Sequence, residues 1–251
     1  MQLAMTGRIA LITGASSGFG AHFARLFVRE GARVIIGARR VDRIAALAEE
    51  LGDAALAVAM DVNDEASIIA AYDAAEAKFG TVDTVVANAG ISADGRSTEV
   101  PAADVAAVMA TNFTGAYLTA REGAKRMIAA GFKDDERGRI VLIGSITAEL
   151  TAQGDAAYAA GKAAVAHLGR QFAREWVRQG VNVNTIQPGY IQTEIAGDWF
   201  QTEGGARQIA NFHRRRMCPI EALDAPLLFL SSDASRYVTG ATLTVDDGQV
   251  L

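Results

Sequence analysis

The sequence of 251 residues contains a single cysteine, Cys218, which excludes an intrachain disulfide and any metal site built from several thiolates. The three histidines do not have metal-ligand spacing, so we expect no metal centre. There is no run of 18 apolar residues, so we expect no membrane-spanning helix and no membrane partner. The stretch MQLAMTGRIA lacks the charged and apolar regions of a secretory leader, and we expect a cytoplasmic protein.

An excess of basic charge is also missing. The formal net charge is −5, which argues against nucleic acid as a partner. With 50% hydrophobic and 21% charged residues, the composition is that of an ordinary soluble protein that can bury a sizeable core. Because no linker, repeat or low-complexity run interrupts the chain, we expect residues 1–251 to form a single domain.

Short runs rich in valine and isoleucine alternate with longer stretches of helical composition. The predicted strands are 8–13, 33–37, 55–60, 82–88, 139–144, 181–186 and 241–246. The predicted helices include 18–30, 41–51, about 101–130 and 155–179. Strands that are apolar throughout and separated by helices predict an α/β fold with a parallel sheet covered on both faces. The segment at about 194–220 does not fit this alternation, and we expect it to form a substrate lid over the sheet edge.

The first predicted strand runs into the loop TGASSGFG at 13–20, directly before a helix. Glycine lets the backbone turn tightly and approach a pyrophosphate, which then meets the positive end of that helix. A glycine-rich turn without a ligand is the alternative, but the strand–loop–helix context favours dinucleotide binding. The T-G-x-x-x-G-x-G spacing resembles the short-chain dehydrogenase/reductase family.

Other motifs carry the same resemblance from residue 7 to residue 248. ANAG at 87–90 is similar to the family's N-N-A-G, with Ala87 in place of the first asparagine. QPGYIQTE at 187–194 is similar to P-G-x-x-x-T. The resemblance implies a Rossmann-type, doubly wound NAD(P)-binding domain. The cofactor contacts it implies, beside those considered below, are Gly14, Ser16, Ser17, Gly18, Phe19, Gly20, Asp61, Val62, Asn88, Ala89, Gly90, Pro188, Gly189, Ile191 and Thr193.

The end of the second predicted strand bears on the choice of cofactor. An acidic residue there holds the ribose 2′-hydroxyl of NAD, whereas an arginine accommodates the 2′-phosphate of NADP. Ala38 stands at the acidic position and Arg39 follows it, with Arg40 in support. We therefore predict a preference for NADP(H), with NAD(H) as the alternative, although Asp42 is near and Ser17 stands where many NADP-using members carry a basic residue.

YAAGK at 158–162 places a tyrosine and a lysine on the same face of a helix. An ammonium near a phenol favours the phenolate, so we expect Lys162 to lower the pKa of Tyr158. Ser145 lies 13 positions before Tyr158, as in the family, and Asn112 begins a sequence similar to its N-x-x-G. The resemblance implies a catalytic tetrad. In it Tyr158 exchanges the proton, Ser145 orients the substrate oxygen, Lys162 also holds the nicotinamide ribose, and Asn112 marks a helix kink on a proton path.

These features predict an NADP(H)-dependent oxidoreductase that interconverts a ketone and a secondary alcohol. A 3-oxoacyl thioester reductase is an alternative, for which Arg137, Arg139 and Arg174 could bind an acyl carrier. An NADP-sensing scaffold protein is a second alternative, but it should have lost part of the tetrad. The resemblance also implies a homotetramer with the helices around 101–130 and 155–179 at an interface.

We expect the walls of the substrate pocket to come from residues 91–96, 146–153 and 190–213. The candidates Leu150, Gln153, Tyr190, Trp199 and Phe200 suggest a fairly apolar site for a bulky or aromatic ketone.

Overall fold

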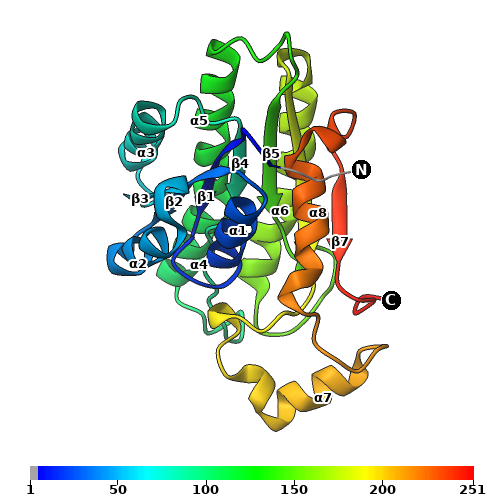
Figure 1. Ribbon diagram of the computed structural model, residues 1–251. Coiled ribbons are helices and arrows are strands. Elements are labelled where there is room, and N and C mark those ends of the chain that lie inside the picture. The colour runs from blue at the N-terminus through cyan, green and yellow to red at the C-terminus, as the bar shows by residue number, and fades with distance from the viewer. Residues whose placement is uncertain (1–4) are drawn as a thin grey trace.

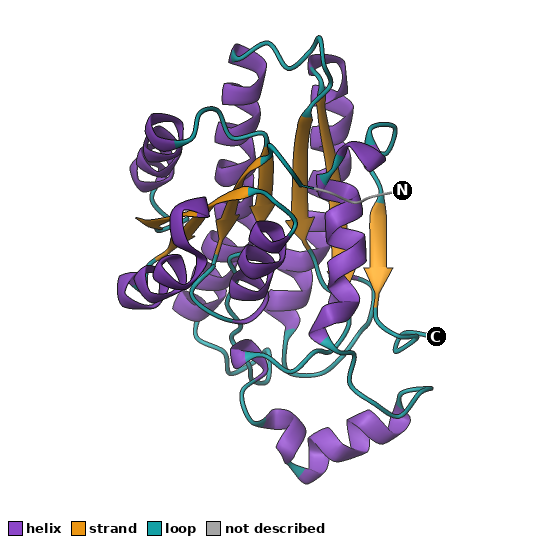
Figure 2. Ribbon diagram, in the orientation of Figure 1, coloured by secondary structure: helices purple, strands orange, loops and turns teal. Residues whose placement is uncertain are grey.

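The computed structural model describes residues 5–251. Residues 1–4, part of the stretch in which we expect no leader, lie outside the described residues. One sheet forms the middle layer, and all its strands run parallel in the order β3-β2-β1-β4-β5-β6-β7 (Figures 1 and 2). The strands are β1 Ile9–Thr13, β2 Arg33–Ala38, β3 Ala55–Ala59, β4 Thr84–Ala87, β5 Gly138–Ile143, β6 Val181–Pro188 and β7 Thr242–Val245. The predicted α/β fold with a helix-covered parallel sheet is confirmed.

Helices cover both faces of this sheet. They are α1 Gly18–Arg29, α2 Val41–Leu51, α3 Glu65–Lys78, α4 Ala102–Met109, α5 Gly115–Ala129, α6 Ala156–Trp176, α7 Glu203–Asn211 and α8 Asp224–Ser231. One buried cluster joins α1, α2 and α8 to the sheet, and the other joins α3, α5 and α6 to the opposite face. Helix α8 has no counterpart among the sequence predictions.

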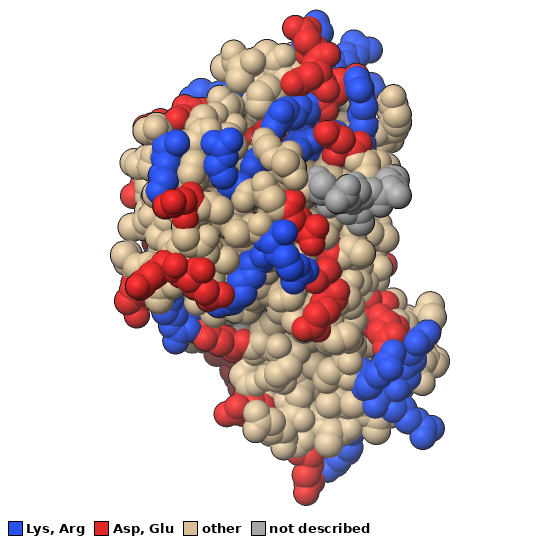
Figure 3. All heavy atoms as spheres, in the orientation of Figure 1, with Lys and Arg blue, Asp and Glu red and all other residues tan. Residues whose placement is uncertain are grey.

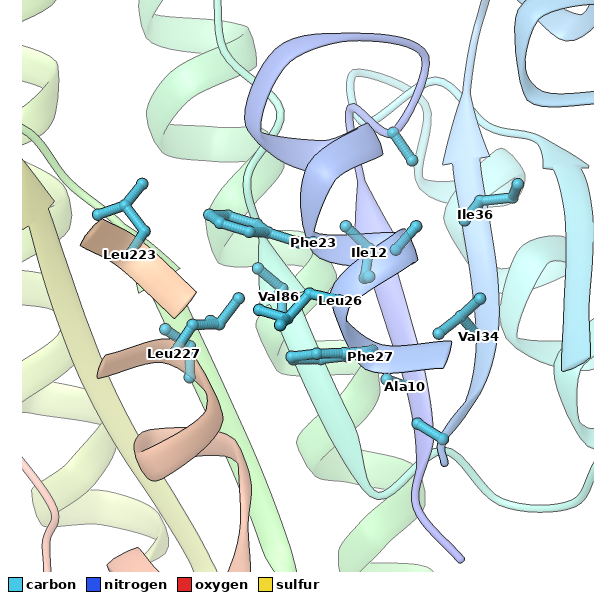
Figure 4. Close-up of a cluster of buried hydrophobic side chains, with 14 of the residues drawn as sticks. Ala10, Ile12, Phe23, Leu26, Phe27, Val34, Ile36, Val86, Leu223 and Leu227 are labelled. Atoms are coloured by element: carbon cyan, nitrogen blue, oxygen red, sulfur yellow. The ribbon is translucent and has the colours of Figure 1, made fainter. Parts of the chain in front are cut away.

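The strands feed both clusters because successive side chains point to opposite faces. Within β1, Ile12 belongs to the α1 side and Leu11 to the α6 side. On the α1 side, Phe23 lies against the sheet near Val86, and Leu227 comes from α8 (Figure 4). Burying each such side chain contributes about 1.5–3 kcal/mol. This two-sided packing fixes where each strand ends, and therefore where the loops at its carboxyl end lie.

The strand order reverses between β1 and β4, which are neighbours with crossovers to opposite sides of the sheet. In open parallel sheets, ligands bind outside the carboxyl ends of the strands at such a switch point. The glycine loop after β1 and the loop after β4 both begin there.

Two segments depart from regular elements. The helix predicted for 101–130 is divided into α4 and α5 by a π-helical turn, Ala110–Thr114, which contains Asn112. The segment 194–220 forms short 3₁₀ turns and α7, which projects beyond the carboxyl end of the sheet (Figure 1). This is the end at which the predicted lid would be needed.

Basic and acidic side chains are interspersed over the face shown in Figure 3. Within residues 5–251, no helix is both long and apolar enough to cross a bilayer.

Candidate active site

The glycine loop and the loop after β4 are packed tightly against each other. Thr13 Oγ1 accepts hydrogen bonds from the backbone N–H groups of Asn88 and Ala89, both at 3.0 Å. The side-chain amide of Asn88 donates to the carbonyl of Thr13 at 2.8 Å. Gly14 has φ +67°, and a Cβ atom there would lie 2.9 Å from the Cα of Ala89. A Cβ at Gly20 would lie 2.5 Å from the carbonyl oxygen of Gly14, so both positions need glycine.

Helix α1 begins without a local partner for its first N–H groups. Its N-cap residue, Ser17, makes no side-chain cap hydrogen bond, and the first turn has no acidic residue. Unpaired N–H groups and the positive end of the helix dipole form a site suited to phosphate. The residues at this end of β1 therefore fit the pyrophosphate of a dinucleotide.

A cavity of about 450 Å³ lies over this loop and the ends of β2 and β4. The predicted residues that line it are Gly14, Ser16, Ser17, Gly18, Phe19, Arg39, Arg40, Asp61, Val62, Asn88, Ala89, Gly90, Tyr158, Lys162 and Thr193. Of the residues predicted as cofactor contacts, Gly20, Pro188, Gly189 and Ile191 do not line this cavity. Glu194, also in the lining, was not predicted.

The two arginines after β2 are in different situations. Arg40 donates to Ser16 Oγ at 2.9 Å and Ser17 Oγ at 2.6 Å, and pairs with Glu194 at 2.8 Å. Arg43 pairs with the same carboxylate at 2.6 Å, and the two arginines hold the pKa of Glu194 at about 2. Arg39 is exposed and lines the cavity, and no hydrogen bond or ion pair within residues 5–251 engages its side chain. Arg39 is therefore the guanidinium free to bind a further anion.

Tyr158 and Lys162 lie one turn apart on α6, with Lys162 Nζ 5.5 Å from the centre of the tyrosine ring. Burial raises the pKa of Tyr158 to about 12, and interaction with the Ser145 hydroxyl offsets part of this effect. Burial lowers the pKa of Lys162 to about 8, and its Nζ donates to the carbonyl of Ile143 at 2.8 Å. The expected lowering of the pKa of Tyr158 is therefore wrong for this structure, because burial of the phenol is the largest effect and only the interaction with Ser145 opposes it.

Ser145 follows β5, and its hydroxyl is held by Thr147. Ser145 Oγ accepts from the Thr147 backbone N–H at 3.2 Å and from Thr147 Oγ1 at 3.0 Å. Because both contacts use Ser145 as the acceptor, its own proton is left for another oxygen. Thr147 lies within the predicted pocket wall 146–153 and lines the second cavity, but its contact with Ser145 was not predicted.

Asn112 lies buried in the π-helical turn. Its Oδ1 accepts from the N–H of Ile91 and its Nδ2 donates to the carbonyl of Ile91, both at 2.9 Å. The side chain therefore fixes the strand-to-helix loop after β4. Because both polar atoms of the side chain are engaged by Ile91, any part that Asn112 takes in proton transfer would have to come from its backbone. The π turn interrupts the regular helical hydrogen bonds there.

A second cavity of about 410 Å³ adjoins the first. The two share Phe19, Gly144, Tyr158 and Thr193, so the tyrosine stands at their junction. The second cavity is lined by Ser145, by Pro188, Gly189 and Ile191, and by Gln153, Tyr190, Trp199 and Phe200. Leu150 does not line it, so that part of the predicted wall is wrong. Gln208, within the predicted range 190–213, also lines it, and so does Asp155, which lies outside the predicted ranges.

Tyr190 connects the segment 194–220 to this cavity. Its ring lies 5.6 Å from that of Phe200 and 5.7 Å from that of Phe212. Its backbone N–H donates to Gln249 Oε1 at 2.6 Å, and Gln249 Nε2 donates back to its carbonyl at 3.2 Å. The C-terminal residues therefore help to hold the wall of the second cavity.

Within residues 5–251, histidine, cysteine and acidic side chains form no group of three that could hold a metal ion.

The arrangement brings a nucleotide cleft, a Tyr–Lys pair and a positioned serine to one edge of a parallel sheet. A family profile for the short chain dehydrogenases matches residues 8–204. The chain belongs to the short-chain dehydrogenase/reductase family, and it is an oxidoreductase acting on CH–OH groups with NAD(P).

Similar proteins span nearly the whole chain. The cis-4-hydroxycyclohexanecarboxylate dehydrogenase of Sinomonas cyclohexanicum is 37% identical over 250 residues, which cover 98% of this chain and 97% of the relative. The 3-oxoacyl-[acyl-carrier-protein] reductase of Vibrio harveyi is 32% identical over 247 residues, covering 98% and 99%. A gluconate 5-dehydrogenase from Burkholderia cenocepacia, solved with NADP and tartrate, is 33% identical with a TM-score of 0.92, covering 99% of this chain and 97% of that one.

Proposed function

We propose that this protein is an NADP(H)-dependent oxidoreductase that interconverts a ketone and a secondary alcohol, with Tyr158 as the general acid or base. The observation that carries the cofactor choice is Arg39, whose exposed guanidinium lines the nucleotide cavity directly after Ala38, where an acidic residue would favour NAD. Because cells usually keep NADPH reduced, ketone reduction is the direction we propose.

The residues at the junction of the two cavities have different roles in the transfer of hydride and proton. A bound nicotinamide cofactor supplies or accepts the hydride. With a pKa of about 12, Tyr158 stays protonated at neutral pH and is ready to donate to an oxygen that gains negative charge. Ser145, whose oxygen already accepts two hydrogen bonds from Thr147, donates to the same substrate oxygen and orients it. Lys162 lies one turn from the phenol and lines the nucleotide cavity, where its ammonium can hold the nicotinamide ribose.

The cofactor proposal is tested by initial rates with NADPH and NADH on one panel of ketones. The wild type should prefer NADPH, and Arg39→Asp should shift the ratio of kcat/KM values toward NADH by at least about tenfold, since one ionic contact is worth about 1.5–3 kcal/mol. Arg33→Asp, at the far end of the same strand, is the matched control. Unchanged selectivity in Arg39→Asp would refute the assignment of Arg39.

A 3-oxoacyl thioester reductase is the second candidate, favoured by the similarity to the Vibrio harveyi enzyme. The arginines expected to bind its carrier are misplaced. Arg139 is buried and bonds to the carbonyls of Glu136 and Ser232, and Arg137 pairs with Asp83 at 2.7 Å. Both lie at the amino end of β5, opposite the active site. Arg174, 16 residues after Tyr158, is about 24 Å along α6 from it. Activity confined to the thioester would nevertheless favour this candidate.

We also propose that the segment 194–220 is a lid that closes over the bound nucleotide, because Glu194 ties it to Arg40 beside the glycine loop. Added NADPH should then protect 194–216 from protease, and unchanged cleavage would argue against closure.

Oligomerisation is a separate proposal. Val105 on α4 and Tyr117 and Ile128 on α5 are exposed apolar side chains, which supports a homotetramer through these helices. Light scattering of the purified protein would give the mass of the assembly and so test the tetramer. We also propose that the protein acts in the cytoplasm.

A further inference from the structure

The substrate cavity is acidic. Asp94 and Asp155 contribute to its lining, and among the described residues no lysine, arginine or histidine does. The remaining walls are largely apolar and aromatic, from Tyr190, Trp199 and Phe200. A carbon skeleton can bind against such walls, but a substrate that carries an anionic group would meet two carboxylates and no cation.

Asp155 is the carboxylate closest to the reacting group along the chain. It precedes α6 as the N-cap residue, three positions before Tyr158, and so shares a helix face with the phenol. Its side chain makes no cap hydrogen bond. Its Oδ1 is buried and has no hydrogen-bond partner within residues 5–251. Leaving a buried acceptor unpaired is costly. Because Asp155 also lines the second cavity, a ligand bound there could supply a donor to this carboxylate.

Asp155 interacts electrostatically with other ionisable groups of the cavity. Burial, with Asp94 nearby, raises the pKa of Asp155 above its usual value. In turn, Asp155 contributes to the raised pKa values of Tyr158 and Tyr190. The geometry agrees with these effects, because Asp155 and Tyr158 both line the second cavity.

We propose that Asp155 determines substrate specificity, an inference that rests on the proposed function. Its carboxylate accepts a hydrogen bond from a donor group on the substrate, which is a second hydroxyl or an ammonium. It disfavours substrates that carry a carboxylate at that place. Two of the similar proteins are named for carboxylate substrates, a hydroxycyclohexanecarboxylate and gluconate. The acidic lining sets this chain apart from such substrates.

The test uses four cyclohexanones that differ only at carbon 4: methyl, hydroxyl, dimethylammonium and carboxylate. With the wild type and NADPH, kcat/KM for the hydroxyl or ammonium compound should exceed that for the methyl compound by about tenfold, and the carboxylate should fall below it by about as much. A gain for the hydroxyl compound alone identifies polyhydroxylated substrates, and a gain for the ammonium compound alone identifies amino ketones.

Asp155→Asn keeps the shape and a good N-cap residue but removes the charge. It should lower the ratio of ammonium to carboxylate kcat/KM values by about a hundredfold, mostly through KM, and leave the methyl compound within about threefold. It should also move the limb of the pH profile on which alcohol oxidation rises with pH to lower pH, because Tyr158, the base in that direction, loses a negative neighbour while Asp94 and Tyr190 remain. Glu149→Gln, an exposed acid outside the cavity lining, is the control and should change none of these values.

An unchanged ammonium-to-carboxylate ratio in Asp155→Asn would overturn the inference while leaving the proposed function intact. Absence of turnover with every ketone would instead count against the proposed function. In that case, dissociation constants measured by calorimetry in Tyr158→Phe, with and without Asp155→Asn, read the same charge ratio without catalysis. A ratio that shifts as above supports the inference, and one that does not shift overturns it.

Discussion

Lys162 is a buried ammonium that the fold holds at an energetic cost. Burial lowers its pKa from 10.5 to about 8, which corresponds to about 3 kcal/mol of destabilisation at neutral pH. In Lys162→Met this cost disappears, but the carbonyl of Ile143 loses its donor, a loss of about 1–2 kcal/mol. The inactive variant should therefore be more stable than the wild type at pH 7 by about 1–2 kcal/mol.

The pH dependence gives the sharper test. Between pH 8 and 10.5 the unfolded wild type binds a proton that the folded protein does not, so wild-type stability rises with pH relative to the variant. The advantage of Lys162→Met is thus present below pH 8 and lost by about pH 10.5. Urea unfolding followed by tryptophan fluorescence at pH 7 and near pH 10 measures both differences. The exposed Lys133→Met should show no such trend, and a constant difference for Lys162→Met would refute the reasoning.

Three further substitutions probe the site. Tyr158→Phe should abolish turnover but keep NADPH affinity within about threefold by fluorescence titration, because the phenol acts in proton transfer; near-normal rates would overturn its role. Thr147→Val should lower kcat about tenfold with little change in KM, since Ser145 loses one of its two donors, and Thr147→Ser should restore the rate; an equal loss in both variants would point to packing instead. Glu194→Gln should speed proteolysis within 194–216 without changing global stability by more than about 0.5 kcal/mol, because its pairs with Arg40 and Arg43 are exposed; a cleavage rate equal to that of the wild type would show that these pairs do not hold the lid.

The positions of the strands along the chain and their parallel arrangement could be predicted because a parallel sheet buried on both faces requires continuous apolar runs between helices. The glycine loop could also be predicted, since Gly14 and Gly20 are dictated by backbone approach that no other residue allows. Helix α8 was not predicted from the sequence. Its position is set by tertiary packing of Leu227 and its neighbours against α1 and the sheet. The π turn around Asn112 was anticipated only as a kink, because its form depends on the contact of that side chain with Ile91.

The candidate site divides along the same line. Positions fixed by backbone geometry around the nucleotide cavity follow local spacing, and the sequence locates most of them. The balance of charge does not follow local spacing. The pKa of Tyr158 depends on how much burial the folded chain imposes, and proximity to Lys162 alone predicts the wrong direction. The local sequence does not distinguish Asp155 from other residues at a helix start, and only the cavity and its unpaired oxygen give it a role in binding. Substrate choice in this protein therefore rests on side chains whose significance appears only once the two cavities are seen to meet at one tyrosine.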